Sequence, residues 1–203
     1  MRPVRLIAYS DYLCPWCYVA TVRLERLEQE FTSDLDIEWR SFLLRPRPDS
    51  KRTMEKFRQY TQSWTRPAAE ESGAEFRVWS TEEGPPSHSI PPHLAAKAAA
   101  SIDREAFERL HQRLLHAYFA ENRDITSRGT LNELWLEVGL AADDFQRIDD
   151  PVHLRTVIEQ HNEAIELGVG GVPAVRAADS DVAVTGAHPI ETYRRWVSKL
   201  LSA

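Results

Sequence analysis

The spacing of hydrophobic and polar residues predicts a βαβ unit at the start of the chain. Residues 4–9 form a short run of strand-forming residues that follows a proline. Residues 15–31 place apolar residues at helical spacing, with arginine and glutamate at the positions between them. Residues 35–43 begin with apolar and charged residues in alternation, which is typical of a strand with one buried face. The expected order of elements is therefore strand, helix, strand.

The middle of the chain has the pattern of a helical region. Residues 45–53 form a polar linker with two prolines, and residues 72–92 hold four prolines and two glycines, which predicts a loop or a broken helix. Apolar residues at helical spacing predict the helices of this region, which cover 51–64, 92–101, 103–121 and 129–138.

Polar residues at helix ends support two of these helices. Asp103 is suited to cap the N-terminus of the helix over 103–121. Thr130 and Glu133 have the spacing of a capping box for the helix that follows, and Gly139 is suited to end that helix.

The end of the chain returns to a mixed pattern. Pro151 suits the first turn of a helix and Pro189 opens another. The elements expected here are a helix over 151–167, strands over 172–177 and 181–185, and a helix over 189–201. We therefore predict an α/β protein in which residues 1–45 and 151–203 form one discontinuous domain and residues 46–150 form an inserted α-helical domain.

Composition narrows the possible functions. The chain has 203 residues, 42% of them hydrophobic, which is enough for a sizeable core. The formal net charge of −6 disfavours nucleic acid as a partner. No apolar run approaches the roughly 18 residues of a membrane span. The N-terminal sequence lacks the features of a signal peptide, so we expect a cytoplasmic protein that is not a membrane protein.

The chain's two cysteines, Cys14 and Cys17, stand at the start of the predicted helix over 15–31. A reducing cytosol argues against a structural disulfide, and so short a loop would constrain the unfolded chain little. One CxxC pair cannot form a tetrahedral zinc site alone, and the seven histidines show no matching pair near it. We therefore predict a redox-active pair and no metal site.

The position of the pair predicts different roles for the two thiols. The N-terminus of a helix offers unpaired N–H groups, which favour the thiolate form of a cysteine. Pro15 suits the first helical turn because its missing N–H has no intrahelical partner there. We expect Cys14 to be the more exposed, attacking thiol and Cys17 to resolve the mixed disulfide. Trp16 lies between them and can shield the pair or contact a substrate.

Five segments together carry a resemblance. In chain order they are the DxxCPWC motif that ends at Cys17, WRSFLLRP, AYFAENRDI, GVGGVPA and AVTGAHP. The sequence resembles the DsbA-like thioredoxin-fold family, and in particular its cytoplasmic FrnE-type branch. The resemblance implies a thioredoxin fold with an inserted α-helical domain. It also implies thiol–disulfide exchange at Cys14 and Cys17 beside Pro173 in a cis peptide bond.

The same resemblance suggests the surroundings of the site. It implies that Pro15, Trp16 and Val172 contact the substrate. The expected substrates are protein or small-molecule thiols and disulfides, without a bound cofactor but with glutathione or another small thiol as a possible reductant. A homodimer is possible in this family. Two departures leave substrate preference open: Arg45 stands where the branch usually has asparagine, and residues 77–92 fit the branch poorly.

Two alternative functions stay open at this point. Kappa-class glutathione transferases and 2-hydroxychromene-2-carboxylate isomerases share the architecture but have serine at the position of Cys14, so the cysteine favours redox chemistry. A peptide-binding chaperone that uses the cysteines as a redox switch is the second alternative. It would still bind its client after Cys14→Ser.

Three other residues allow two interpretations each. Asp11 could orient water or move a proton, or it could accept loop N–H groups. Trp64 and Trp79 could line a substrate cleft or pack in the core.

Overall fold

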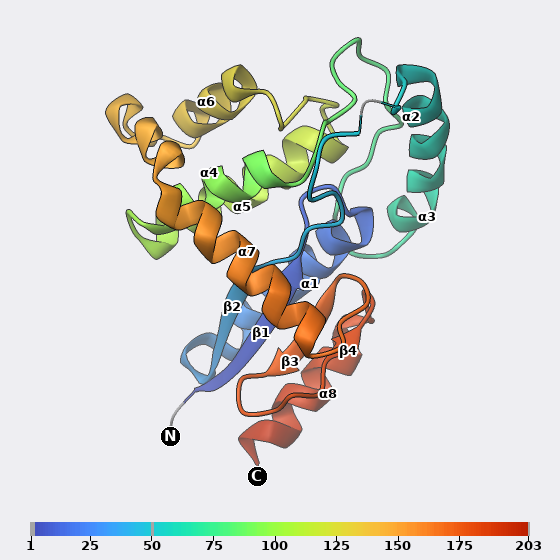
Figure 1. Ribbon diagram of the computed structural model, residues 1–203. Coiled ribbons are helices and arrows are strands. Elements are labelled where there is room, and N and C mark those ends of the chain that lie inside the picture. The colour runs from blue at the N-terminus through green and yellow to red at the C-terminus, as the bar shows by residue number, and fades with distance from the viewer. Residues whose placement is uncertain (1–2, 50, 203) are drawn as a thin grey trace.

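A computed structural model describes residues 3–49 and 51–202, and its centre is a four-stranded sheet. The strands are β1 (Val4–Ser10), β2 (Leu35–Ser41), β3 (Ala174–Ala177) and β4 (Val184–Thr185), in the spatial order β2-β1-β3-β4. The pair β1–β2 is parallel, whereas β1–β3 and β3–β4 are antiparallel. The two ends of the chain therefore lie side by side in one sheet (Figure 1).

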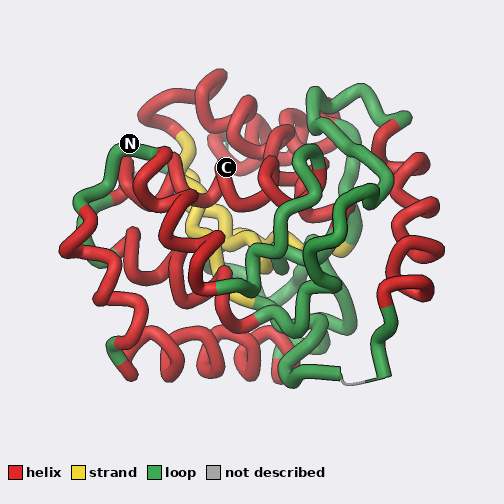
Figure 2. The backbone as a smooth tube through the Cα atoms, turned by 90° about the horizontal axis from the view of Figure 1, so that it is seen from above, coloured by secondary structure: helices red, strands yellow, loops and turns green. Residues whose placement is uncertain are grey.

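Helices make up most of the remaining chain. They are α1 (Pro15–Phe31), α2 (Met54–Thr61), α3 (Thr65–Ala68), α4 (Ile90–Ala100), α5 (Arg104–Phe119), α6 (Arg128–Glu137), α7 (Pro151–Glu166) and α8 (Ile190–Leu201). Three short 3₁₀ helices are η1 (Thr32–Asp34), η2 (Gln62–Trp64) and η3 (Ala142–Asp149). Seen from above, the strands lie among the helices (Figure 2). Within the described ranges, none of the helices is both long and apolar enough to cross a bilayer.

The central strand β1 is buried on both faces because helices cover both sides of the sheet. Successive side chains of a strand point to opposite faces, so Leu6 and Ala8 pack in one apolar cluster and Ile7 and Tyr9 in another. The first cluster includes side chains of α1 and α8, and the second includes Ala164 of α7. Figure 1 shows α7 crossing the face of the sheet opposite α1 and α8.

Polar contacts join α7 to the sheet beneath it. Glu163 on α7 accepts a hydrogen bond from the buried Arg176 of β3 at 2.9 Å and forms an ion pair with Arg40 of β2. The Nε of Arg176 also donates to the Tyr9 hydroxyl at 3.3 Å. A buried guanidinium needs such partners because an unpaired buried charge is strongly destabilising.

A separate aromatic core joins the helices of the middle region. Trp64 packs edge-on against Tyr118 and Phe119 of α5, with ring centroids 5.3 and 4.9 Å apart. Trp64 and Trp79 are both buried in this cluster, so packing is the role that the structure supports for them. Leu13, just before α1, and Tyr18 in its first turn belong to the same cluster. The N-terminus of α1 therefore lies between the sheet and the helical core.

Several predicted elements match the structure closely. The helix α1 has the predicted bounds, and β1 is one residue longer than predicted. The carboxylate of Asp103 accepts from the Ala106 N–H at 2.7 Å, which confirms the predicted cap. Gly139 follows α6 with a φ of +77°, the left-handed conformation expected of a glycine at a helix end.

Other predictions were wrong in detail. The capping box at Thr130 is absent, because α6 already begins at Arg128 and Thr130 lies inside it. Pro91 and Pro92, which were expected partly in a loop, occupy the first turn of α4, where a missing N–H is tolerated. The last strand is much shorter than 181–185, and the 3₁₀ helix η3 was not predicted.

The buried face of α5 can be tested by removing one side chain. Leu114 is fully buried, so Leu114→Ala should lower the free energy of unfolding by about 3 kcal/mol, measured by urea denaturation. The matched control is Leu136→Ala, because Leu136 is 46% exposed and its loss should change stability by about 0.5 kcal/mol or less. Equal effects of the two substitutions would contradict the packing described for α5.

Candidate active site

Cys14 is the N-cap residue of α1, and its thiol lies among backbone groups from both ends of the chain. Its Sγ accepts a hydrogen bond from the Cys17 N–H at 3.3 Å and lies 3.4 Å from the Val172 carbonyl oxygen. Pro15 occupies the first turn, so the chain begins the helix directly after the cysteine. An N–H group directed at the sulfur stabilises negative charge on it.

The two thiols differ in exposure in the predicted order. Cys14 is 5% exposed and Cys17 is fully buried, and neither forms a disulfide. Burial raises the pKa of the Cys17 thiol well above its ordinary value, and the neighbouring Cys14 raises it further. The backbone N–H of Asp11 and the side chain of Ser10 act in the opposite direction. Cys17 is therefore protonated at neutral pH when both thiols are reduced.

The loop before β3 forms the second side of the site. The Val172–Pro173 peptide bond is cis, as the resemblance implied, and Pro173 is buried directly before the strand. The Pro173 carbonyl accepts from the Gly186 N–H at 2.8 Å, which joins this loop to the end of β4. Trp16, two residues after Cys14, is 36% exposed, so it is accessible to a substrate. The roles of Pro15, Trp16 and Val172 in substrate binding stay predictions.

Asp11 holds the turn between β1 and α1. Its two carboxylate oxygens accept hydrogen bonds from the N–H groups of Leu13 and Leu44, each at 2.7 Å. Burial raises the pKa of Asp11 to about 6, while these bonds and the side chain of Ser89 oppose the rise. Of the two roles considered for Asp11, the structure supports the acceptor of loop N–H groups.

A pocket next to Cys14 was missed by the analysis of the sequence. It has a volume of about 250 Å³ and is lined by Leu13, Leu44, Arg45, Arg52 and Tyr60. The sequence did show that position 45 has arginine where the FrnE-type branch usually has asparagine. That arginine could not be assigned to a pocket from the sequence, because the other lining residues are distant from it in the chain. These five residues come from three segments that only the fold brings together.

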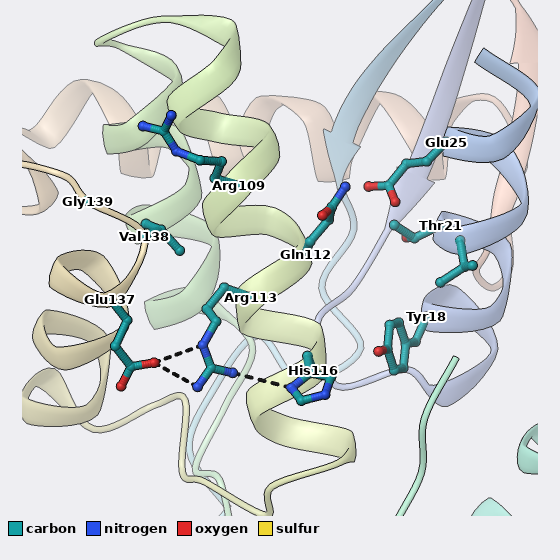
Figure 3. Close-up of a pocket in the computed structure, with 11 residues that line it drawn as sticks. Tyr18, Thr21, Glu25, Arg109, Gln112, Arg113, His116, Glu137, Val138 and Gly139 are labelled. Atoms are coloured by element: carbon teal, nitrogen blue, oxygen red, sulfur yellow. Dashed lines mark hydrogen bonds and ion pairs between the residues drawn. The ribbon is translucent and has the colours of Figure 1, made fainter. Parts of the chain in front are cut away.

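A larger cavity of about 710 Å³ lies between α1, α5 and the end of α6, and its lining does not include the cysteines. Figure 3 shows Glu25 of α1 and Gln112 of α5 directed toward each other across it. Arg113 is held in an ion pair with Glu137 at 2.7 Å. Burial raises the pKa of Glu25 to about 7, and nearby carboxylates add to the rise.

Comparison with known proteins gives the chain's relationships. The sequence model of the DSBA-like thioredoxin domain family matches residues 5–197. The uncharacterised protein YwbO of Bacillus subtilis (strain 168) is 26% identical over 206 residues, which cover 96% of each chain.

Solved structures agree on the fold. A Nitrosomonas europaea protein, provisionally described as a protein disulfide isomerase, has a TM-score of 0.82 at 18% identity and matches over 98% of both chains. The cytosolic disulfide reductase DsbM of Pseudomonas aeruginosa has a TM-score of 0.72 at 21% identity, again over 98% of both chains. Its structure with GSH has a TM-score of 0.66 at 22% identity and covers 98% of this chain and 100% of that one.

The raised pKa of Glu25 predicts a pH-dependent stability. Above its folded pKa of about 7 the half-buried carboxylate is ionised at a cost, and protonation removes that cost as the pH falls from about 8 to about 5. Glu25→Gln resembles the protonated form, so it should be more stable than the parent by about 2 kcal/mol near pH 8 and nearly equal near pH 5.

Urea unfolding of both proteins across this pH range measures the difference. The control is Glu159→Gln, which changes the charge at an exposed position of α7. A stability difference for Glu25→Gln that does not change with pH would contradict the assignment.

Proposed function

Because the chain belongs to the DSBA-like thioredoxin domain family, we propose that it is a thiol–disulfide oxidoreductase whose active dithiol is Cys14 and Cys17. One observation carries the proposal. The Sγ of Cys14 receives the N–H of Cys17 at the start of α1 and faces the Val172 carbonyl before Pro173. This arrangement directs one N–H group at the sulfur and presents the sulfur beside backbone that a substrate chain can approach.

The exchange proceeds in two steps that conserve atoms and electrons. The Cys14 thiolate attacks one sulfur of a substrate disulfide, forms a mixed disulfide and releases the first substrate thiol. Cys17 then loses its proton, attacks the Sγ of Cys14 and releases the second thiol. Two electrons and two protons pass from the protein to the substrate, and the protein keeps a Cys14–Cys17 disulfide. The reverse sequence would oxidise a substrate dithiol.

The direction and setting of the reaction also belong to the proposal. We place the protein in the cytoplasm as a reductase of protein or small-molecule disulfides, related to the FrnE-type branch, and the similarity to cytosolic DsbM supports this. The chemistry needs no bound cofactor. Glutathione or another small thiol would regenerate the dithiol, which the DsbM structure with GSH supports. Isomerisation of protein disulfides is a further possibility for the same dithiol.

Single-cysteine variants test the two thiol roles. Cys14→Ser should lower the rate of disulfide reduction at least about a hundredfold, because it removes the attacking thiolate. Cys17→Ser should still react with a disulfide but stop at the mixed disulfide, because the resolving thiol is missing. Intact-mass measurement after mixing with hydroxyethyl disulfide distinguishes these outcomes.

A redox titration against glutathione buffers separates this function from the glutathione-dependent alternative. Thiol alkylation and mass spectrometry would detect the loss of two hydrogens at Cys14 and Cys17, which would support the dithiol couple. The midpoint potential of the titration would give the direction of electron flow. A stable glutathione adduct at Cys14 without an internal disulfide would contradict it. If the Cys14→Ser variant reduced disulfides at the parent rate, both the dithiol function and the glutathione-dependent alternative would be contradicted.

A further inference from the structure

The pocket beside Cys14 is lined by two arginines that form no ion pair within the described part of the chain. We call it the Arg45–Arg52 pocket, and it is lined by Leu13, Leu44, Arg45, Arg52 and Tyr60. Many arginines of this protein, such as Arg40 and Arg104, are held in ion pairs. Across residues 3–49 and 51–202, by contrast, neither Arg45 nor Arg52 lies within ion-pair distance of a carboxylate.

The position of Arg52 is set by other contacts. Its Nη1 donates to the Pro86 carbonyl at 2.7 Å, and its guanidinium lies 4.3 Å from the centre of the Phe57 ring. Burial lowers the pKa of Arg52, and the charge of Arg45 contributes to the same effect. Two neighbouring like charges repel each other, so an anion between them would be stabilised by both.

The carboxylate of Asp11 interacts with Arg45 but does not line the pocket. Burial raises the pKa of Asp11, and the charge of Arg45 opposes part of that rise. However, Asp11 is fully buried, and both of its oxygens already accept backbone N–H groups from Leu13 and Leu44. Asp11 therefore offsets part of the charge of Arg45, but a solute that enters the pocket meets the two guanidinium groups and no carboxylate of the lining.

The lining of the pocket adjoins the reactive cysteine in the chain. Burial raises the pKa of Tyr60, and the charges of Cys14, Arg52 and Arg45 all act on its hydroxyl. Leu13, which lines the pocket, directly precedes Cys14 in the chain. The two guanidinium groups therefore line a pocket whose wall is formed in part by the residue next to the nucleophile.

We propose that the Arg45–Arg52 pocket binds a carboxylate of a small disulfide substrate while the sulfur of that substrate reacts at Cys14. This inference rests on the proposed oxidoreductase function and adds its substrate class, a low-molecular-weight disulfide that carries carboxylates. Guanidinium groups suit the task because their planar forks match the geometry of a carboxylate. A volume of about 250 Å³ suits one arm of such a molecule, since pockets for whole drug-sized ligands measure roughly 300–1,000 Å³.

The reaction is the same exchange with a charged partner. One anionic disulfide oxidises the Cys14–Cys17 dithiol, its S–S bond breaks, and two anionic thiols are released with the two electrons and two protons. Each mixed-disulfide intermediate keeps one carboxylate arm attached to Cys14, within reach of the pocket. Both the attack and the resolution can therefore proceed with the carboxylate bound.

Three disulfides of different charge test the proposal in single-turnover reactions of the reduced protein. They are dithiodipropionate, which is anionic, hydroxyethyl disulfide, which is neutral, and cystamine, which is cationic. Rapid alkylation and mass spectrometry measure the loss of two hydrogens over time, and this gives the second-order rate constant for each probe. The same rates with free N-acetylcysteine methyl ester give the intrinsic reactivity of each probe.

The expected result is a preference for the anionic probe beyond that intrinsic reactivity. Relative to the neutral probe, dithiodipropionate should be favoured by about tenfold, which is the low end of what a charge-assisted contact contributes. Cystamine should be disfavoured, and raising the salt concentration should reduce both effects.

Arg45→Met and Arg52→Met should each lower the ratio of anionic to neutral rates by about threefold or more. Using the ratio within one variant cancels any change in thiol reactivity or folding. Arg47→Met is the matched control, because Arg47 is an exposed arginine near Arg45 that does not line the pocket. It should leave the ratio at the parent value.

The outcomes separate this inference from the function on which it rests. If no probe oxidises the cysteine pair, the proposed oxidoreductase function itself fails. If all probes oxidise it with the intrinsic ratio of the free thiol, the function stands and the substrate class is wrong. A preference for the anion that survives both Arg45→Met and Arg52→Met would also overturn the assignment to this pocket.

Discussion

The buried carboxylate of Asp11 is the contact on which the geometry of the cysteine site depends. One oxygen binds the turn that leads into α1 and the other binds the N–H of Leu44 after β2, so a single side chain joins two segments. Ser89, directly before α4, extends this junction, because its hydroxyl accepts from the Arg45 N–H at 3.0 Å. The backbone that carries Cys14 is thereby attached to both the sheet and the helical region.

This attachment explains how α1 can pack against both the helical cluster and the sheet. The N-terminal residues Leu13 and Tyr18 pack with the helical cluster, whereas Leu24 and Leu27 further along α1 pack against the sheet. A change in the angle of α1 would disturb both clusters, and interiors packed at this density resist such changes. The sulfur of Cys14 consequently keeps its position relative to Val172, although the two residues lie at opposite ends of the chain.

The sequence predicted the structure well where interactions between neighbouring residues determine it. The helix α1 and the cap at Asp103 follow from periodicity and side-chain hydrogen bonding over a few residues. The capping box at Thr130 was wrong because a helix start earlier in the chain competed with it. The resemblance, rather than any local rule, predicted the cis bond before Pro173.

The parts of the site that escaped prediction depend on contacts between distant segments. Arg52, like Arg45, is an ordinary polar-linker residue in the sequence, and its role depends on Phe57, Pro86 and the fold around Cys14. The raised pKa of Glu25 likewise arises from burial against another helix rather than from its neighbours in the chain. Charge and burial of this kind become visible only when segments far apart in sequence are placed together.

Arg45 links the architecture of the site to its chemistry. Its backbone exchanges hydrogen bonds with Ser89 beside the Asp11 junction, while its guanidinium lines the pocket next to Cys14. An asparagine at this position could keep the backbone contacts but would remove the charge. The FrnE-type branch, which the sequence resembles, usually has that asparagine. The backbone contacts that hold the cysteines can therefore be kept while the charge at position 45 changes. The backbone of Arg45 thus serves the framework of the site, while its charge is the part of the residue that the proposed binding of a substrate carboxylate uses.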